Sequence, residues 1–312
     1  MCKAISTLGM ERIEWLKLRK GGIGGSDAGA VCGLNPYVSP MSVYHDKTTD
    51  NIENLDNEAM RQGRDLEEYV AQRFTEETGL KVRRSNKMYW SELYPFMYAD
   101  VDRLIVGEDA GLECKTVSPY GADKWKDGAV PKHYLIQCVH YMIVTGKRAW
   151  YIAAIIFGQE FVYRKIEWDE ALAEYLIAIE SDFWENHIAV SCMPDPDGSE
   201  SCSEVVEEYF GKHCKADEVP LSADMSAKLD RRQEIMTEMK NLDREKTQLE
   251  QEVKVFLDNH EAASNERYRV SWKLVTSDRL NTKLLKTEQP EIYKKYLQNG
   301  QSSRFTVKEL CG

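Results

Sequence analysis

The chain has 312 residues, of which 42% are hydrophobic and 30% are charged, enough to bury a core in one large domain or two smaller ones. No charged-then-apolar leader and no apolar run near the roughly 18 residues of a membrane span is seen, so we expect a cytoplasmic protein without a signal peptide or a membrane span. The formal net charge of −11 argues against a protein that coats DNA through a basic surface. A nuclease whose basic channel admits DNA only at its site stays compatible with this charge.

Eight cysteines are scattered along the chain without a CxxC pair, which favours reduced thiols in an intracellular protein. A zinc or iron–sulfur site could be assembled from Cys192, Cys202 and Cys214 with His187 and His213. The irregular spacing makes free cysteines the better interpretation.

The N-terminal part predicts an amphipathic helix over residues 10–20, followed by a glycine-rich turn. After the turn, Ser26 or Asp27 could cap a second helix that begins at residue 28. Free N–H groups at such a helix start can hold a phosphate, but glycine-rich turns before helices are common and mostly structural.

Residues 56–79 predict a long helix that ends at a glycine and carries an apolar stripe of Leu66, Val70 and Phe74. Glu67 borders this stripe. A carboxylate at the margin of a core-facing stripe can be a metal ligand, yet the local pattern by itself favours a solvated glutamate.

Strands are predicted over residues 81–89 and 97–106. The second of them overlaps the stretch YADVDRLIVGEDAGLECKT at residues 98–116. This stretch predicts a β-hairpin with acidic residues at one end. Residues two apart on a strand share a face, so Glu113 and Lys115 project together. The residues expected to face the core are Leu112, Cys114 and Val117.

By the same two-residue period, Asp100 and Asp102 share a strand face, so either could join Glu113. Converging carboxylates are costly without a cation between them, and hard oxygen ligands of this kind suit Mg²⁺ or Mn²⁺. With Lys115 beside them, they form a set of groups suited to metal-dependent phosphodiester hydrolysis.

Helices and strands alternate after this hairpin. The expected elements are a helix over 131–146, strands over 149–157 and 161–168, and a helix from 169 to about 187. Gln137 and Tyr141 are four residues apart and therefore share one face of the first helix. Without more context, they would be a polar edge on a packed helix.

Prolines, a glycine, serines and acids from residue 191 onward mark an exposed linker. The predicted organisation is a core at 1–190, a linker at 191–214 and a C-terminal extension at 215–312. In the extension, residues 225–257 predict one helix of about 50 Å with apolar residues at coiled-coil steps. A tail follows, with strands expected at 268–275 and 304–307 and a helix around Pro290.

Several ordered motifs in residues 10–190 resemble the YqaJ-type viral recombinase family, which includes the lambda exonuclease. They are WLKLRKGGIGGSD at 15–27, GRDLEE at 63–68, ADVDRL at 99–104, LECK at 112–115 and QCVHYMIVTGKRAWY at 137–151. The resemblance implies an α+β (α/β) fold with the PD-(D/E)xK nuclease core, in which helices flank a central mixed sheet. The chain departs from the shorter lambda-type enzymes from about residue 204 onward.

The resemblance also implies roles for individual residues. Asp102 and Glu113 match the metal-ligand acids, Lys115 matches the catalytic lysine, and Glu67 matches a helix carboxylate that completes the metal site. The implied ligands also include the carbonyl of Cys114. The other matches are Arg19 and Ser26 at the DNA 5′-phosphate, Gln137 behind the site and, less firmly, Asp100 and Tyr141.

A family member of this type is expected to be a Mg²⁺-dependent exonuclease, with Mn²⁺ as a substitute and two ions per site. It would digest one strand of linear duplex DNA from 5′ to 3′ and leave 3′ tails for a single-strand annealing protein. The resemblance further implies a ring-shaped trimer and a phage or prophage gene in a bacterial host. The alternatives are an endonuclease or end-processing nuclease on the same core, and a non-catalytic scaffold that binds DNA ends.

Overall fold

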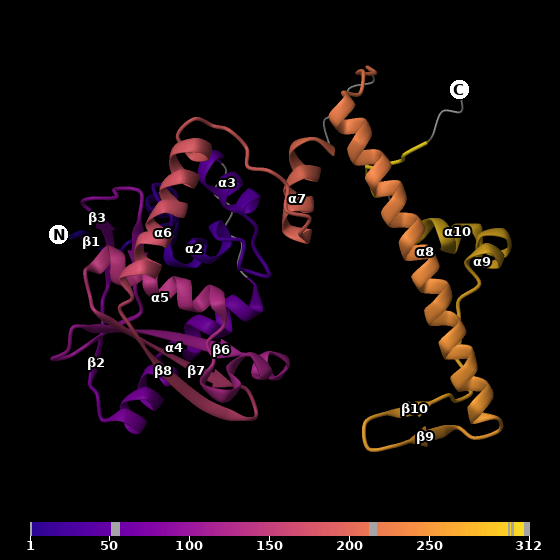
Figure 1. Ribbon diagram of the computed structural model, residues 1–312, viewed down its shortest axis with the longest axis horizontal. Helices are drawn as coiled ribbons and strands as arrows, with labels where there is room; N and C mark the ends of the chain where they lie inside the picture. The colour runs from indigo at the N-terminus through magenta and orange to yellow at the C-terminus, as the bar shows by residue number, and fades with distance from the viewer. Residues whose placement is uncertain (1, 51–56, 212–216, 299, 301–302, 309–312) are drawn as a thin grey trace. The chain divides into compact units, whose positions relative to one another are not determined.

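The structure is a computed structural model that describes residues 2–50, 57–211, 217–298, 300 and 303–308. The chain divides into two compact units, Met1–Lys212 and His213–Gly312. The first unit combines helices with a sheet, and the second is built on one long helix (Figure 1).

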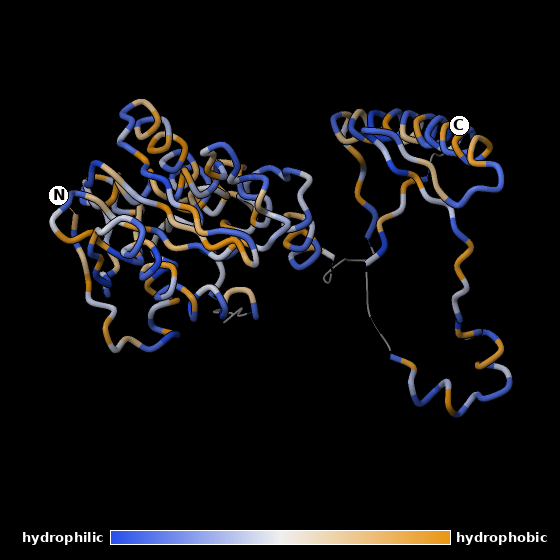
Figure 2. Tube along the Cα trace, turned by 90° about the horizontal axis from the view of Figure 1, so that it is seen from below, coloured by the Kyte–Doolittle hydropathy of each residue, from blue (hydrophilic) through white to orange (hydrophobic). Residues whose placement is uncertain are grey.

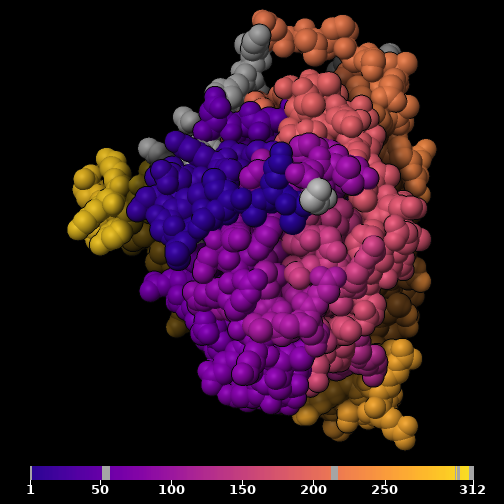
Figure 3. Space-filling view, turned by 90° about the vertical axis from the view of Figure 1, so that its left-hand side faces the viewer, coloured from indigo at the N-terminus to yellow at the C-terminus, as the bar shows by residue number. Residues whose placement is uncertain are grey.

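The first unit contains most of the regular structure. Its helices are α1 (Arg12–Lys20), α2 (Gly25–Val31), α3 (Pro40–Thr48), α4 (Glu58–Thr78), the 3₁₀ helix η1 (Pro119–Gly128), α5 (Lys132–Thr145), α6 (Glu170–Phe183), the π-helix η2 (Trp184–Ile188) and α7 (Glu200–Tyr209). Its strands are β1 (Cys2–Ser6), β2 (Val82–Arg84), β3 (Lys87–Ser91), β4 (Tyr98–Asp100), β5 (Arg103–Ile105), β6 (Ala110–Val117), β7 (Ala149–Ile156) and β8 (Glu160–Glu167). Figure 3 shows one face of this unit, where the N-terminal segment (indigo) lies against later parts of the chain (purple and pink).

Among the described residues, the central sheet has five strands in the order β2-β5-β6-β7-β8. β6 and β7 run parallel, and the remaining pairs are antiparallel. A smaller sheet pairs β3 with β1 and β4. The predicted α+β (α/β) fold with a central mixed sheet flanked by helices is therefore confirmed.

The two faces of the sheet are covered by different helices. Leu112 and Cys114 of β6 pack with Val70 and Phe74 of α4 in one apolar cluster. Val117 lies five positions after Leu112, an odd step that turns it to the other face, and it joins the larger cluster on the α5 side. Val117 therefore faces the core, as predicted, but on the opposite side of the sheet from Leu112.

The helices that were predicted from periodicity and end signals are confirmed. α4 ends at Gly79 and α5 ends at Gly146, both in the left-handed conformation that glycine adopts most readily. Asp169 caps α6 by accepting a hydrogen bond from the Leu172 N–H. The start expected for α4 at residue 56 lies outside the described residues.

The glycine-rich turn ends differently from the prediction. Gly24, rather than Ser26 or Asp27, is the N-cap of α2. Asp27 lies in the first turn, where its Oδ2 accepts a hydrogen bond of 3.0 Å from the Gly24 N–H. A carboxylate three residues into a helix can satisfy the free N–H group as well as an N-cap side chain can.

Each of the two strands predicted before the hairpin is interrupted and contributes to both sheets. β2 and β3 are separated at Asn86, which has a φ of 49° and turns the chain. β4 and β5 are likewise separate strands in different sheets. The expectation that Asp100 and Asp102 share one strand face is therefore wrong, because no continuous strand joins them.

The predicted linker at 191–214 is also wrong for its middle part. Residues 200–209 form α7, which packs on α3 of the first unit through a cluster containing Met41, Cys202 and Val205. Cys202 is a buried apolar group there, which removes it from the zinc or iron–sulfur alternative. His213 and Cys214 lie outside the described residues.

The second unit contains α8 (Ala223–Leu257), β9 (Ala262–Ser264), β10 (Arg269–Ser271), α9 (Thr282–Glu288) and α10 (Pro290–Lys295). The long helix is confirmed, and Figure 2 shows hydrophobic and hydrophilic residues recurring in turn along it. The strand expected at 268–275 is shorter, and residues 304–307 form no strand. Pro290 starts a second helix because its ring cannot continue the hydrogen bonding of α9. No helix within the described ranges is long and apolar enough to cross a membrane.

A close contact between α2 and α5 positions the N-terminal turn. A Cβ atom added at Gly25 would lie 2.3 Å from the Tyr141 ring, and one at Gly29 would lie 2.9 Å from the His133 Cβ. These two glycines, one helical turn apart, let the helices approach more closely than side chains would permit.

Gly25→Ala is therefore expected to lower the free energy of unfolding by about 1–3 kcal/mol, because Tyr141 is buried and must move. Gly63→Ala in α4 is the matched control, since its new methyl group would meet only Thr116 Oγ1, at 3.8 Å. The control should be neutral or stabilising by up to about 1 kcal/mol. Urea unfolding followed by tryptophan fluorescence measures both, and equal stabilities would contradict the close-contact account.

Candidate active site

Glu113 is the centre of the candidate site. It projects from β6 toward α5 and is only 3% exposed. Its Oε1 accepts hydrogen bonds from Lys115 Nζ at 2.5 Å and from Gln137 Nε2 at 2.8 Å. Gln137 Nε2 also lies 2.9 Å from the Tyr141 hydroxyl. The predicted projection of Glu113 and Lys115 to one face is confirmed, and Gln137 and Tyr141 share the facing side of α5.

Asp102 reaches the same region from the turn before β5. The pairing of β5 with β6 involves Leu112 and Gly111, and the edge of β6 continues past them to Cys114. Asp102 Oδ2 occupies that edge by accepting a hydrogen bond of 2.8 Å from the Cys114 N–H. Burial, followed by the negative charges of Glu113 and Glu67, raises the pKa of Asp102 well above its usual value.

Glu67 is held by an arginine that the sequence reasoning did not single out. Arg103 is 2% exposed, and its Nη1 donates to Glu67 Oε1 and to the Asp102 backbone carbonyl. Arg103 Nη2 donates to Glu68 Oε2 at 3.1 Å. Both glutamates thus bind the same guanidinium. A charged residue directly after Asp102 in a buried strand was the available signal, because a buried arginine needs carboxylate partners.

Two observations fit a divalent cation at Asp102 and Glu113. Glu113 Oε2 is buried and has no hydrogen-bond partner among the described residues, and Asp102 is destabilised by the negative charges beside it. The third predicted carboxylate, Glu67, is engaged by Arg103. Across the described part of the chain, no group of three histidine, cysteine or acidic side chains is placed to hold a metal ion.

Arg19 and Ser26 lie together, as the family resemblance implied. Arg19 Nη2 donates to Ser26 Oγ at 2.6 Å and to Asp27 Oδ1 at 2.9 Å. Lys47 Nζ, fully buried, lies 2.9 Å from Asp27 Oδ2. Burial would raise the pKa of Asp27, but Lys47 and Arg19 outweigh it and hold that pKa well below its usual value. The site therefore combines two cations with one carboxylate that is ionised at neutral pH.

Asp100 is held by a residue of α1, on the N-terminal side of the site, rather than by the acidic residues of the hairpin. Trp15 Nε1 donates to Asp100 Oδ2 at 2.9 Å. The guanidinium carbon of Arg19 lies 5.6 Å from the centre of the Trp15 ring. Trp15 thus connects α1 to the end of β4, two residues before Asp102.

A buried pair on the far side of α5 was also missed by sequence reasoning. His140 Nδ1 lies 2.8 Å from Glu180 Oε1, and His140 Nε2 lies 2.8 Å from the Tyr98 carbonyl oxygen. Because a carbonyl only accepts, Nε2 carries a proton, and a second proton is shared between Nδ1 and Glu180. The partners of His140 lie on α6 and β4, so the sequence around His140 gave no signal of this pair.

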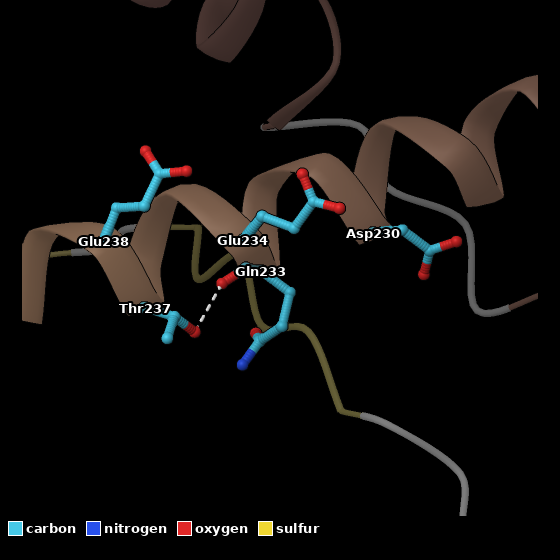
Figure 4. Close-up of a pocket in the computed structure, with 5 residues that line it drawn as sticks. All are labelled: Asp230, Gln233, Glu234, Thr237 and Glu238. Atoms are coloured by element: carbon cyan, nitrogen blue, oxygen red, sulfur yellow. Dashed lines mark hydrogen bonds between the residues drawn. The ribbon is translucent and has the colours of Figure 1, made fainter.

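The pocket shown in Figure 4 lies on α8, in the second unit. Its lining consists of Asp230, Gln233, Glu234, Thr237 and Glu238. The Thr237 hydroxyl donates to the Gln233 carbonyl at 2.9 Å, so it is satisfied within the helix. Three of the five lining residues are acidic, and two of them, Glu234 and Glu238, pair with Arg231.

The mixed sheet with its flanking helices is an exonuclease-type fold. The structure of LHK-Exo in complex with dAMP matches with a TM-score of 0.50 at 20% identity, covering 64% of this chain and 98% of that chain. A structure of LHK-Exo, an alkaline exonuclease from Laribacter hongkongensis, gives a TM-score of 0.48 at 21% identity over 57% of this chain and 93% of that one.

Sequence comparisons give the family. Residues 14–148 match the YqaJ-like viral recombinase domain. The YqaJ protein of Bacillus subtilis (strain 168) is 34% identical over 304 residues, which cover 96% of this chain and 95% of that protein. The chain belongs to the YqaJ-like viral recombinase family. This membership supports a role in recombination, and the fold is similar to that of LHK-Exo.

The His140–Glu180 pair predicts a pH dependence of stability. Burial lowers the pKa of His140, but the Glu180 charge and the hydrogen bonds outweigh burial and raise that pKa above its usual 6.5. Burial also raises the pKa of Glu180. Both groups bind protons more tightly in the folded state, so their stabilisation is complete below the unfolded pKa values and is lost as the pH rises through the folded ones.

We therefore expect the unfolding free energy to decline as the pH is raised above 6.5 through the folded pKa of His140. Glu180→Gln should flatten this decline, because a neutral amide can donate to a neutral histidine. Urea unfolding of both proteins at a series of pH values measures the effect. Parallel pH profiles for the two proteins would contradict the assignment.

Proposed function

We propose that the chain is a Mg²⁺-dependent exonuclease that digests one strand of linear duplex DNA from 5′ to 3′. The 3′ single-stranded tails that it leaves would serve recombination by strand annealing. The observation that carries the proposal is the pairing of a buried carboxylate centre at Asp102 and Glu113 with a cationic site at Arg19 and Ser26. A nuclease that starts at DNA ends needs both a hydrolytic centre and a group that recognises the end.

Asp102, Glu113 and the Cys114 carbonyl would hold Mg²⁺ or Mn²⁺, and two ions per site would require Glu67 as well. Bound there, the metal would supply a water nucleophile at neutral pH and neutralise the charge on the departing oxygen. Glu67 can take this role with the oxygen that Arg103 does not hold, or after Arg103 releases it. Gln137 keeps Glu113 oriented, because its amide donates to one carboxylate oxygen and leaves the other unpartnered.

Lys115 acts as a cation rather than as a general base in this proposal. Burial would lower the pKa of Lys115, but the Glu113 charge outweighs burial and raises that pKa above its usual value. The Nζ group therefore keeps its proton at neutral pH. It can orient the attacking water and balance the charge that develops on the phosphoryl oxygens.

Arg19 and Ser26 would bind the terminal 5′-phosphate. A guanidinium presents several donors in a fixed plane that matches phosphate oxygens, and the Ser26 hydroxyl adds one more. Asp27 and Lys47 hold Arg19 in place. Since Asp27 stays ionised, Arg19 is oriented before DNA arrives, and less conformational freedom is lost on binding.

The proposal extends to partners by family resemblance. These are double-stranded DNA ends and a single-strand annealing protein, with a ring-shaped homotrimer as the working assembly and a phage or prophage gene as the source. LHK-Exo, whose structure holds dAMP, provides a similar exonuclease fold. A protein acting on DNA in a bacterial host would work in the cytoplasm.

End recognition gives the sharpest test of this function. With Mg²⁺ and linear duplexes, digestion should be at least about tenfold faster at 5′-phosphate than at 5′-hydroxyl ends, because a lost charged hydrogen bond costs about 1.5–3 kcal/mol. Arg19→Ala should remove this difference, and Glu113→Ala should abolish digestion at both ends. Cleavage of circular DNA would favour an endonuclease, and end binding without digestion would favour a scaffold.

The exposed apolar side chains of α8 test the partner assignment. Met239 and Leu242 are 63% and 64% exposed on this helix. If the exposed apolar side chains around Met239 and Leu242 are the docking surface of the annealing protein, Leu242→Glu is expected to weaken its binding at least about tenfold. Gln248→Glu, which adds the same charge on α8, is the control. Unchanged binding and assembly in Leu242→Glu, measured by light scattering and titration, would remove the idea.

A further inference from the structure

Trp15 joins the two halves of the candidate site through different parts of its side chain. The indole N–H donates to Asp100, which lies two residues before Asp102. The ring face lies beside Arg19, the residue that carries the anion site. Arg12 approaches the ring as well, with its guanidinium carbon 4.4 Å from the ring centre.

Polar contacts hold α1 in place. None of its residues is buried, so apolar packing holds this helix weakly. Its polar ties include Lys20 Nζ to the Asp46 and Thr49 carbonyls, Lys47 Nζ to the Arg19 carbonyl, and Arg19 to α2. The bond from Trp15 to Asp100 is the tie that runs directly toward the hydrolytic centre.

The carboxylate of Asp100 is directed by this contact. Asp100 ends β4, whereas Asp102 precedes β5 of the central sheet, and the two strands belong to different sheets. A hydrogen bond to a carboxylate is stronger than one between neutral groups. Asp100 is thus engaged on the α1 side, while Asp102 is engaged at the edge of β6.

Resting on the proposed function, we propose that Trp15 is a positioning residue anchored by Asp100, and that Asp100 is no metal ligand. Together with the bonds from Arg19 to Ser26 and Asp27, the Trp15–Asp100 bond fixes the separation between Arg19 and the Asp102–Glu113 centre. That separation sets how many nucleotides lie between the held 5′-phosphate and the bond that is hydrolysed. With the anchor in place, the enzyme releases mononucleotides. With the anchor lost, Arg19 shifts and the product length becomes mixed.

Trp15→Phe tests the anchor, because phenylalanine keeps a ring for Arg19 and loses only the N–H donor and part of the ring. Trp168→Phe is a closely matched control. Trp168 Nε1 donates to Glu170 Oε2 at 2.7 Å, and the guanidinium carbon of Arg148 lies 4.8 Å from its ring centre. Asp100→Ala removes the acceptor, and Asp100→Asn keeps an oxygen for the indole N–H.

Two measurements are made on the full chain. The first is the ratio of affinities for 5′-phosphate and 5′-hydroxyl duplex ends, by fluorescence anisotropy in EDTA. The second is the length distribution of products released from 5′-labelled duplex with Mg²⁺. In Trp15→Phe and Asp100→Ala, the ratio of affinities for 5′-phosphate and 5′-hydroxyl ends is expected to fall about tenfold. Both variants are also expected to release a mixture of mononucleotides and dinucleotides. Asp100→Asn should restore both values relative to Asp100→Ala, and Trp168→Phe should match the wild type.

Wild-type behaviour in Trp15→Phe in both assays would overturn the proposal. Loss of hydrolysis in Asp100→Asn to the level of Asp102→Asn would also overturn it, since a ligand would then have been removed. If the wild-type protein binds ends but does not digest them, the exonuclease function fails by itself. The affinity ratio in EDTA then still decides whether Trp15 positions Arg19: a reduced ratio in Trp15→Phe supports the role, and an unchanged ratio overturns it.

Discussion

The burial of Glu113 beside Asp102 is the constraint on which the rest of the site depends. A carboxylate with 3% exposure loses its hydration, and a second acid nearby adds repulsion. Lys115 and Gln137 stabilise one oxygen of Glu113, and the other oxygen has no partner among the described residues. A buried network that is only partly satisfied is costly to keep unless a ligand completes it. The geometry therefore favours a cation at this position.

The same constraint reaches the N-terminal turn through α5. Gln137 contacts both Glu113 and Tyr141, and Tyr141 lies against Gly25 at the start of α2. The position of Ser26, one residue after this contact, is thus tied to the position of the carboxylate centre. Trp15 and Asp100 provide a second connection through α1. Two independent contacts of this kind make the distance between the Arg19–Ser26 site and the Asp102–Glu113 centre a property of the fold rather than of a flexible loop.

Local signals in the sequence were sufficient for most of the fold. Left-handed glycines end α4 and α5, Asp169 caps α6, and alternation places Glu113 and Lys115 on one face of β6. The errors arose where distant contacts decide the structure. The turn at Asn86 and the division between β4 and β5 depend on which sheet each segment joins. α7 was taken for a linker because its flanks are rich in proline, serine and acid, although its apolar residues pack on α3.

The same distinction applies to the candidate site. The order of the motifs, through the family resemblance, implied that Arg19 and Ser26 share one anion site and that Gln137 lies behind the carboxylates. It did not predict that Arg103 would hold Glu67, or that Trp15 would hold Asp100, since both contacts join elements far apart in the chain. Glu67 comes from the helix that covers the opposite face of the sheet from Glu113. Its availability to a metal therefore depends on Arg103, which no spacing rule describes.

The most direct test of the central claim is a crystal of the protein soaked in Mn²⁺ and measured for anomalous scattering. The account predicts an anomalous peak between the Asp102 and Glu113 carboxylates, and the loss of that peak in Asp102→Asn. A soaked crystal with no peak at these residues, or with its peak retained in Asp102→Asn, would contradict the assignment of a metal-dependent hydrolytic centre.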